Sequence, residues 1–97
     1  MSIAKMAGMG YNKNVDDGII FNKAAFKHGF SEEDIRWAAT HPLYEDLMKG
    51  YVNKYLVIGF DTKARLLEIG YNRIDDNTVN LFHADNCNKK YYPLIGW

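Results

Sequence analysis

One histidine of this 97-residue chain, His83, stands where it could transfer a proton. Histidine is the side chain that ordinarily titrates nearest to neutral pH, and His83 ends a segment with the alternating pattern of a strand. A histidine in such a place is also often a hydrogen-bonded packing residue, so both roles stay open. His28 and His41 lie instead where helices are expected to end, which suits residues that cap helices.

The other groups that could do chemistry lack the neighbours that such chemistry needs. Cys87 has no histidine near it in sequence to act as the base that activates a nucleophile. Gly8 and Gly10 lack the strand, helix and lysine of a phosphate-binding loop. The histidines have no paired spacing of the kind that binds zinc. The sequence therefore predicts neither a metal site nor a bound cofactor.

Two short helices are expected within residues 21–41. Ser31 can cap the second helix, because its hydroxyl can accept a hydrogen bond from an unpaired backbone N–H, and acidic residues follow it in the first turn. Gly29 can adopt the left-handed conformation that ends the first helix. Pro42 disfavours a helical residue before it, so we expect the second helix to finish near His41.

Segments with the composition of strands follow at residues 55–60, 66–72 and 78–84. Short turn sequences separate them, which favours an antiparallel meander. Residues 43–53 fit either a helical face or a loop, and we interpret them as a connection. We therefore expect an α+β fold in which two N-terminal helices pack on a small antiparallel sheet, followed by a short C-terminal segment.

Alternation along the last two strands predicts which face of the sheet is buried. The expected core face carries Leu67, Ile69 and Tyr71 from the middle strand and Val79, Leu81 and His83 from the last. Phe82 lies on the opposite, more polar face. We therefore expect another part of the chain or a partner to cover some of that face.

Length and composition predict one folded domain, residues 19–97, preceded by a flexible arm, residues 1–18. The 12 basic and 12 acidic side chains balance, and a neutral chain is less typical of nucleic-acid binders, although the distribution of charge matters more than its sum. A single cysteine cannot form an internal disulfide, and no apolar run approaches the roughly 20 residues of a membrane helix. We expect a cytoplasmic protein.

The segment NKAAFKHGFSEEDIRWAATHPLYED resembles the opening of the BrnT-type toxins, in which a Lys-His-Gly step, a serine, a pair of acids and a proline step follow one another. The strands YLVIGFDTKARLLEIGYNR and TVNLFHADNCNKK keep the family's order, so the resemblance covers roughly residues 20–90. Two positions depart from the family pattern: Asp85 stands where an arginine is typical, and Tyr71 where a histidine is frequent.

The resemblance implies a RelE-like fold and the role of toxin in a type II toxin–antitoxin pair, with RNA as substrate. Metal-independent RNA cleavage needs a base for the 2′-hydroxyl, cations for the phosphate charge and an acid for the leaving oxygen. The implied candidates are Arg65 and Arg73 at the phosphate, Tyr71 or His83 in proton transfer, and Lys89 and Lys90 at the RNA backbone. Each also has an ordinary interpretation as a strand-end charge, a core aromatic residue or a solvated lysine.

A function of a different class fits the same residues: a non-catalytic module of this fold that dimerises or docks a protein. Its contact surface would be the Phe82 side of the sheet, the flexible arm and the aromatic tail at residues 91–97. Exposed, this tail would form a patch that monomers rarely carry, whereas packed it would close an edge of the core. The expected partners are thus a cognate antitoxin, RNA or a second copy of the chain, and no membrane.

Overall fold

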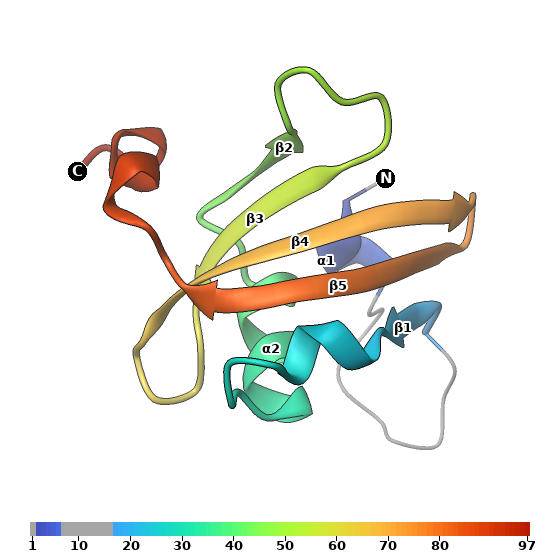
Figure 1. Ribbon diagram of the computed structural model, residues 1–97, viewed down its shortest axis with the longest axis horizontal. Helices are drawn as coiled ribbons and strands as arrows, with labels where there is room; N and C mark the ends of the chain where they lie inside the picture. The colour runs from blue at the N-terminus through green and yellow to red at the C-terminus, as the bar shows by residue number, and fades with distance from the viewer. Residues whose placement is uncertain (1, 7–16) are drawn as a thin grey trace.

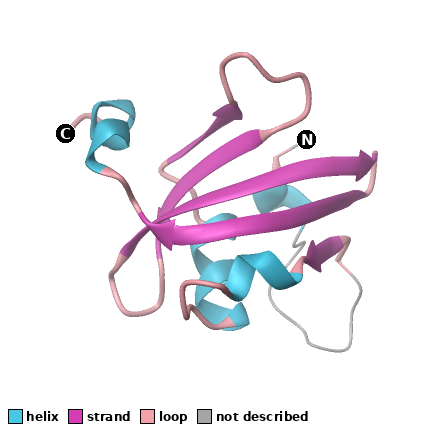
Figure 2. Cartoon of the chain, in the orientation of Figure 1, coloured by secondary structure: helices cyan, strands magenta, loops and turns pink. Residues whose placement is uncertain are grey.

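The computed structural model describes residues 2–6 and 17–97 and has an α+β fold built on a five-stranded mixed sheet (Figures 1 and 2). The strands are β1 (Ile19–Phe21), β2 (Tyr44–Leu47), β3 (Tyr55–Phe60), β4 (Leu66–Asp75) and β5 (Thr78–Asn86). Their order is β1-β5-β4-β3-β2, with β1 parallel to β5 and every other pair antiparallel. The helices are α1 (Ile3–Met6), the 3-10 helix η1 (Lys23–Phe26), α2 (Glu32–Thr40) and the 3-10 helix η2 (Lys89–Ile95).

The local signals around Ser31 and the meander of β3, β4 and β5 are confirmed. The Ser31 hydroxyl accepts a hydrogen bond from the backbone N–H of Asp34 at 3.1 Å, and Gly29 has a φ of +87° at the turn before it. β3 has the expected bounds, while β4 and β5 continue past the expected ends at residues 72 and 84.

The segments that flank α2 differ from expectation. In place of a first helix, residues 19–26 form β1 and the single turn η1, and residues 43–53, interpreted as a connection, contain the edge strand β2. The sheet is therefore mixed and five-stranded rather than a small antiparallel one. Such short strands are stabilised by their neighbours β5 and β3, and pairing of this kind leaves little local trace in a sequence.

The start of the chain, expected to be a flexible arm, packs into the domain where it is described. Ile3 in α1 is fully buried, and its backbone N–H donates a hydrogen bond to the Glu45 carboxylate at 3.0 Å. Residues 7–16, the middle of the expected arm, lie outside the described residues. None of the described helices is long and apolar enough to cross a membrane.

Apolar side chains cluster on both faces of the sheet. The main core lies between α2 and one face and includes Ile35, Ala38, Val57, Leu67, Ile69, Tyr71, Val79 and Leu81. On the second face, Leu56, Ile58 and Cys87 form a smaller cluster, against which Tyr91, Tyr92 and Ile95 of η2 pack. The expectation that something covers part of the polar face is thus confirmed, and the C-terminal segment is the cover, at the end of β5 in Figure 1.

A β-bulge in β5 decides which face His83 occupies. Gly70 pairs with His83, whereas its neighbour Tyr71 pairs with Leu81, so Phe82 is the extra residue. An extra residue shifts the alternation of the strand beyond it.

The prediction that His83 shares the core face is therefore wrong. Ala84 takes the core position beyond the bulge, and His83 joins Glu68 on the second face. Before the bulge the alternation holds, and the core positions of Tyr71 and Leu81 are confirmed.

Gly59→Ala should destabilise the fold, because β3 passes very close to α2 at this residue. An added Cβ would lie 2.3 Å from the Ala38 carbonyl oxygen and 3.1 Å from that of His41, so backbone must move. We expect a loss of about 2 kcal/mol or more in the free energy of unfolding, measured by urea denaturation. An unchanged midpoint would contradict this close approach.

Candidate functional site

Arg65 lies in an ion-pair cluster that joins the β3–β4 turn to the start of α2. Its guanidinium donates to the Asp61 carboxylate through Nε at 2.6 Å and to Asp34 through Nη2 at 3.2 Å. Asp34 also accepts hydrogen bonds from Lys63 Nζ at 2.6 Å and from the Thr62 hydroxyl. These two bonds hold the pKa of the buried Asp34 carboxyl well below its usual range, although burial alone would raise it. Arg65 therefore has a structural role.

Tyr71 and Arg73 lie on the main-core face of β4. Tyr71 is 1% exposed and stacks on Tyr55 with ring centroids 4.9 Å apart. Its hydroxyl donates a hydrogen bond to the Glu45 carboxylate. Burial, and then the Glu45 carboxylate, raise the pKa of the Tyr71 hydroxyl. Arg73 lies over the Tyr55 ring, 5.5 Å from its centroid. The Tyr71 hydroxyl is thus already bonded inside the fold and is separated from His83 by the sheet.

His83 has its partners on the second face of the sheet. Its Nε2 lies 2.9 Å from Glu68 Oε2, and the other oxygen of Glu68 accepts the backbone N–H of Asn88 at 2.6 Å. Glu68 therefore fixes one nitrogen of the His83 ring and is itself held by the residue that caps η2.

A second histidine, His28, lies beside His83. The ring centroids are 6.0 Å apart with the planes nearly perpendicular, and His28 Nε2 lies 3.4 Å from Asp85 Oδ2. Both rings are about one-third exposed, at 33% and 37%, so solvent or a substrate can reach them. Each histidine thus has a carboxylate neighbour and an accessible ring.

Sequence reasoning missed His28, Glu68 and Asp85 as members of one site. His28 was interpreted as a helix cap, yet the left-handed turn at Gly29 brings it to the edge of β5. Glu68 and Asp85 are directly opposite each other in the β4–β5 register, a pairing that depends on the bulge. The Lys-His-Gly step was the one available signal for His28.

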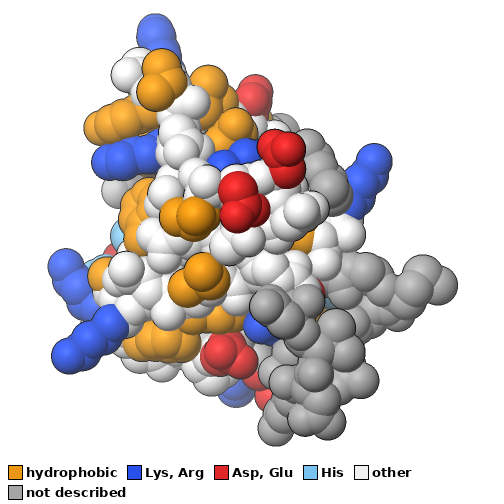
Figure 3. All heavy atoms as spheres, turned by 90° about the vertical axis from the view of Figure 1, so that its right-hand side faces the viewer, with side chains coloured by type: hydrophobic (Ala, Val, Ile, Leu, Met, Phe, Trp, Pro, Cys, Tyr) orange, Lys and Arg blue, Asp and Glu red, His pale blue; other side chains and the backbone are white. Residues whose placement is uncertain are grey.

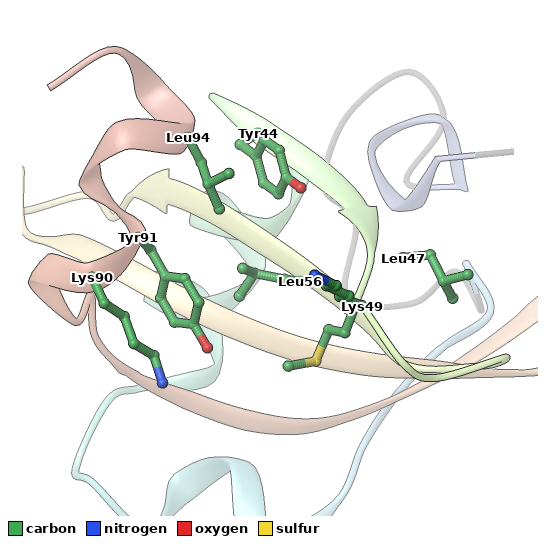
Figure 4. A pocket seen from close by; sticks show the side chains of 8 residues that line it. Tyr44, Leu47, Lys49, Leu56, Lys90, Tyr91 and Leu94 are labelled. Carbon is green, nitrogen blue, oxygen red and sulfur yellow. The ribbon is translucent and has the colours of Figure 1, made fainter.

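His83 lines a groove on the second face, and the His28 ring lies beside His83. A pocket of about 190 Å³ is lined by His83, Glu68, Tyr51, Lys54, Phe82 and Tyr91, among others. It adjoins a second pocket of about 380 Å³, with which it shares Met48, Leu56 and Tyr91. In Figure 4, Lys90 and Tyr91 project from η2 beside this second pocket, with Leu56 of β3 between them and Lys49. Of the two predicted RNA-backbone lysines, Lys90 lines the groove, whereas Lys89 does not line either pocket.

Basic side chains do not gather into one patch on the face shown in Figure 3. In the view of Figure 3, the described Lys and Arg side chains are spread around the rim, with acidic and apolar groups between them.

The described residues contain no group of three or more side chains arranged to hold a metal ion. Burial raises the pKa of the Cys87 thiol, which disfavours the nucleophilic thiolate there. Acid–base chemistry by the histidines is what this arrangement supports.

Asp34→Asn should destabilise the protein in a pH-dependent way. The substitution leaves Lys63 without its buried counter-charge and Arg65 with Asp61 alone, and we expect a loss of about 2 to 4 kcal/mol at neutral pH in urea denaturation. Because folding lowers the pKa of Asp34, its stabilisation is present above the ordinary carboxyl pKa of about 4 and is lost as the pH falls below it. The wild type should therefore lose more stability than the variant on acidification below about pH 5. An equal loss in both would contradict a charged Asp34.

No protein-family model, curated protein or solved structure matches the chain. Its function is therefore inferred from its residues and their geometry, together with the resemblance in the sequence.

Proposed function

We propose that the chain is a metal-independent ribonuclease of the toxin type, with His28 and His83 as its acid–base pair. The observation that carries the proposal is the pair itself: two accessible histidine rings with centroids 6.0 Å apart, each beside a carboxylate, with His83 in the lining of a groove. RNA cleavage through the 2′-hydroxyl needs one group to accept a proton and another to donate one. Two histidines in opposite protonation states supply both.

We assign the role of base to His83 and the role of acid to His28. Glu68 accepts the Nε2 hydrogen of a neutral His83, which leaves the lone pair of Nδ1 to take the proton of the 2′-hydroxyl. The 2′-oxygen then attacks the adjacent phosphorus and forms a 2′,3′-cyclic phosphate as the bond to the 5′-oxygen breaks. In this assignment a protonated His28, beside Asp85, donates a proton to the departing 5′-oxygen.

This assignment gives a role to a residue that departs from the family pattern. Asp85 stands where the resemblance leads one to expect an arginine, and here it is the carboxylate beside His28. Arg65, Tyr71 and Arg73 remain structural in this proposal, because their charged or polar groups are bonded elsewhere in the fold. His83 and Lys90 are the sequence-predicted residues that stay at the site.

The toxin assignment and the cognate antitoxin rest on the resemblance over roughly residues 20–90, and the cytoplasmic location rests on the single cysteine. A direct test is inducible expression of the chain alone in bacteria. We expect growth arrest that co-expression of the neighbouring gene product relieves and that the substitution His83→Gln abolishes. Normal growth at high levels of folded protein would contradict the toxin role.

A second candidate function is a non-catalytic module that docks a protein or a second copy of the chain. Exposed apolar side chains near the groove favour it: Leu47, Tyr51, Val52, Leu94 and Trp97 are 40–96% exposed. Part of the aromatic tail packs on the sheet, so only its outer side chains are available for such contacts. Purified protein that binds a partner but never cleaves RNA would favour this alternative.

The histidine pair can be tested with the third histidine as control. His28→Gln and His83→Gln should each lower the rate of RNA cleavage by about 100-fold or more, because each removes one proton transfer. His41→Gln should change it little, since His41 stacks on Trp37 of α2, away from the groove. Circular dichroism would verify that all three variants are folded. Equal rates for the wild type and the His28 and His83 variants would contradict the pair.

Substitutions on the main-core face separate this site from the one expected from sequence. Tyr71→Phe should cost about 1 kcal/mol of stability through the lost hydrogen bond to Glu45, yet cleave RNA at close to the wild-type rate. Arg73→Gln should also retain cleavage, because it lies on the Tyr55 and Tyr71 rings. Loss of cleavage in a folded Tyr71→Phe protein would contradict the histidine site and favour a site on the main-core face.

A further inference from the structure

We propose that the groove on the second face binds single-stranded RNA, with Phe82 and Tyr91 as surfaces on which unpaired bases stack and Lys54 and Lys90 as phosphate contacts. The inference rests on the proposed ribonuclease function and names the class and the contacts of its substrate. It is carried by the arrangement of rings and cations along the groove, which the acid–base pair does not require.

Ammonium groups lie over the faces of aromatic rings along the groove. Lys54 Nζ is 4.6 Å from the ring centroid of Tyr51 and 5.8 Å from that of Phe82. Lys90 Nζ is 5.0 Å from the ring centroid of Tyr91. Single strands are bound by this combination, in which bases stack on aromatic side chains while cations contact the phosphates.

The Phe82 ring lies over a glycine of the neighbouring strand, which suits a stacking surface. Gly70 lies beneath it, and a Cβ there would come within 3.1 Å of two atoms of the Phe82 ring. The missing side chain at residue 70 therefore lets the ring lie against the sheet. As the bulged residue directly before His83, Phe82 would place a stacked base next to the acid–base pair.

Three lysines and one carboxylate, that of Glu68, line the two pockets. Glu68 is bonded to His83 and to the backbone of Asn88, and Asp85 lies beside His28. Lys49, Lys54 and Lys90 line the pockets. The neutral total thus conceals a locally cationic groove, which fits a polyanion.

The same contacts favour a single strand over a duplex and give little preference among bases. A duplex keeps its bases stacked on each other, so it offers no free base face that could stack on the rings of Phe82 and Tyr91. Stacking reads the face of a base rather than its hydrogen-bonding edge, so different bases are accepted.

The test measures binding separately from cleavage. Fluorescence anisotropy would follow a 2′-O-methyl RNA hexamer, which cannot be cleaved through its 2′-oxygen, and a blunt duplex of the same sequence. We expect the wild type to bind the single strand at least tenfold more tightly than the duplex. Phe82→Leu and Tyr91→Leu should each weaken binding about 5- to 150-fold.

The lysines are tested through salt dependence. Lys54→Gln and Lys90→Gln should each reduce the slope of log affinity against log salt by about 0.7, the value for one phosphate contact on a single strand. Lys23→Gln removes the same charge from η1, outside both pockets, and should leave the slope unchanged.

The outcomes distinguish this inference from the proposed function. Cleavage by the wild type combined with unchanged binding in all four groove variants would contradict RNA binding at the groove but not the proposed ribonuclease function. Weakened binding in those variants would support the groove even if the wild type proved unable to cleave RNA. Preference for the duplex would overturn the inference, as would binding of an acidic peptide at the groove without any binding of the hexamer.

Discussion

The single extra residue in β5 is the constraint on which the arrangement of the candidate site depends. Because Phe82 has no partner of its own on β4, the strand resumes its alternation one position late, with Ala84 in the core and His83 on the opposite face. A regular strand would have buried His83 among apolar side chains, far from Glu68 and from solvent. Gly70 leaves room for the Phe82 ring, since a Cβ at residue 70 would lie 3.1 Å from two atoms of that ring.

The parts of the fold that could be predicted are those whose cause is local. Ser31 caps α2 through its own hydroxyl, the β3 segment is apolar throughout because both its faces are buried, and alternation places Tyr71 in the core. Each of these features depends on residues within a few positions of one another. Such features can therefore be predicted from the sequence.

The parts that could not be predicted depend on contacts between distant segments. β1 and β2 are too short to be recognised from the sequence, and they are stabilised by pairing with β5 and β3. The proximity of His28 to His83 follows from a turn at Gly29 and a bulge at Phe82, and neither position reveals the other. The resemblance indicated a toxin scaffold, yet Arg65 and Tyr71 are held by Asp34, Asp61 and Glu45 for structural reasons that a motif does not convey.

The bonds of Glu45 limit when α1 can dock during synthesis. This carboxylate on β2 accepts hydrogen bonds from the Ile3 backbone and from Tyr71 of β4, and so it joins segments separated by 42 and by 26 positions. During synthesis α1 emerges before either partner exists, and a turn of four residues is not stable alone. Docking of α1 through this bond requires Glu45, 42 positions later in the chain, so α1 cannot dock in this way as it emerges.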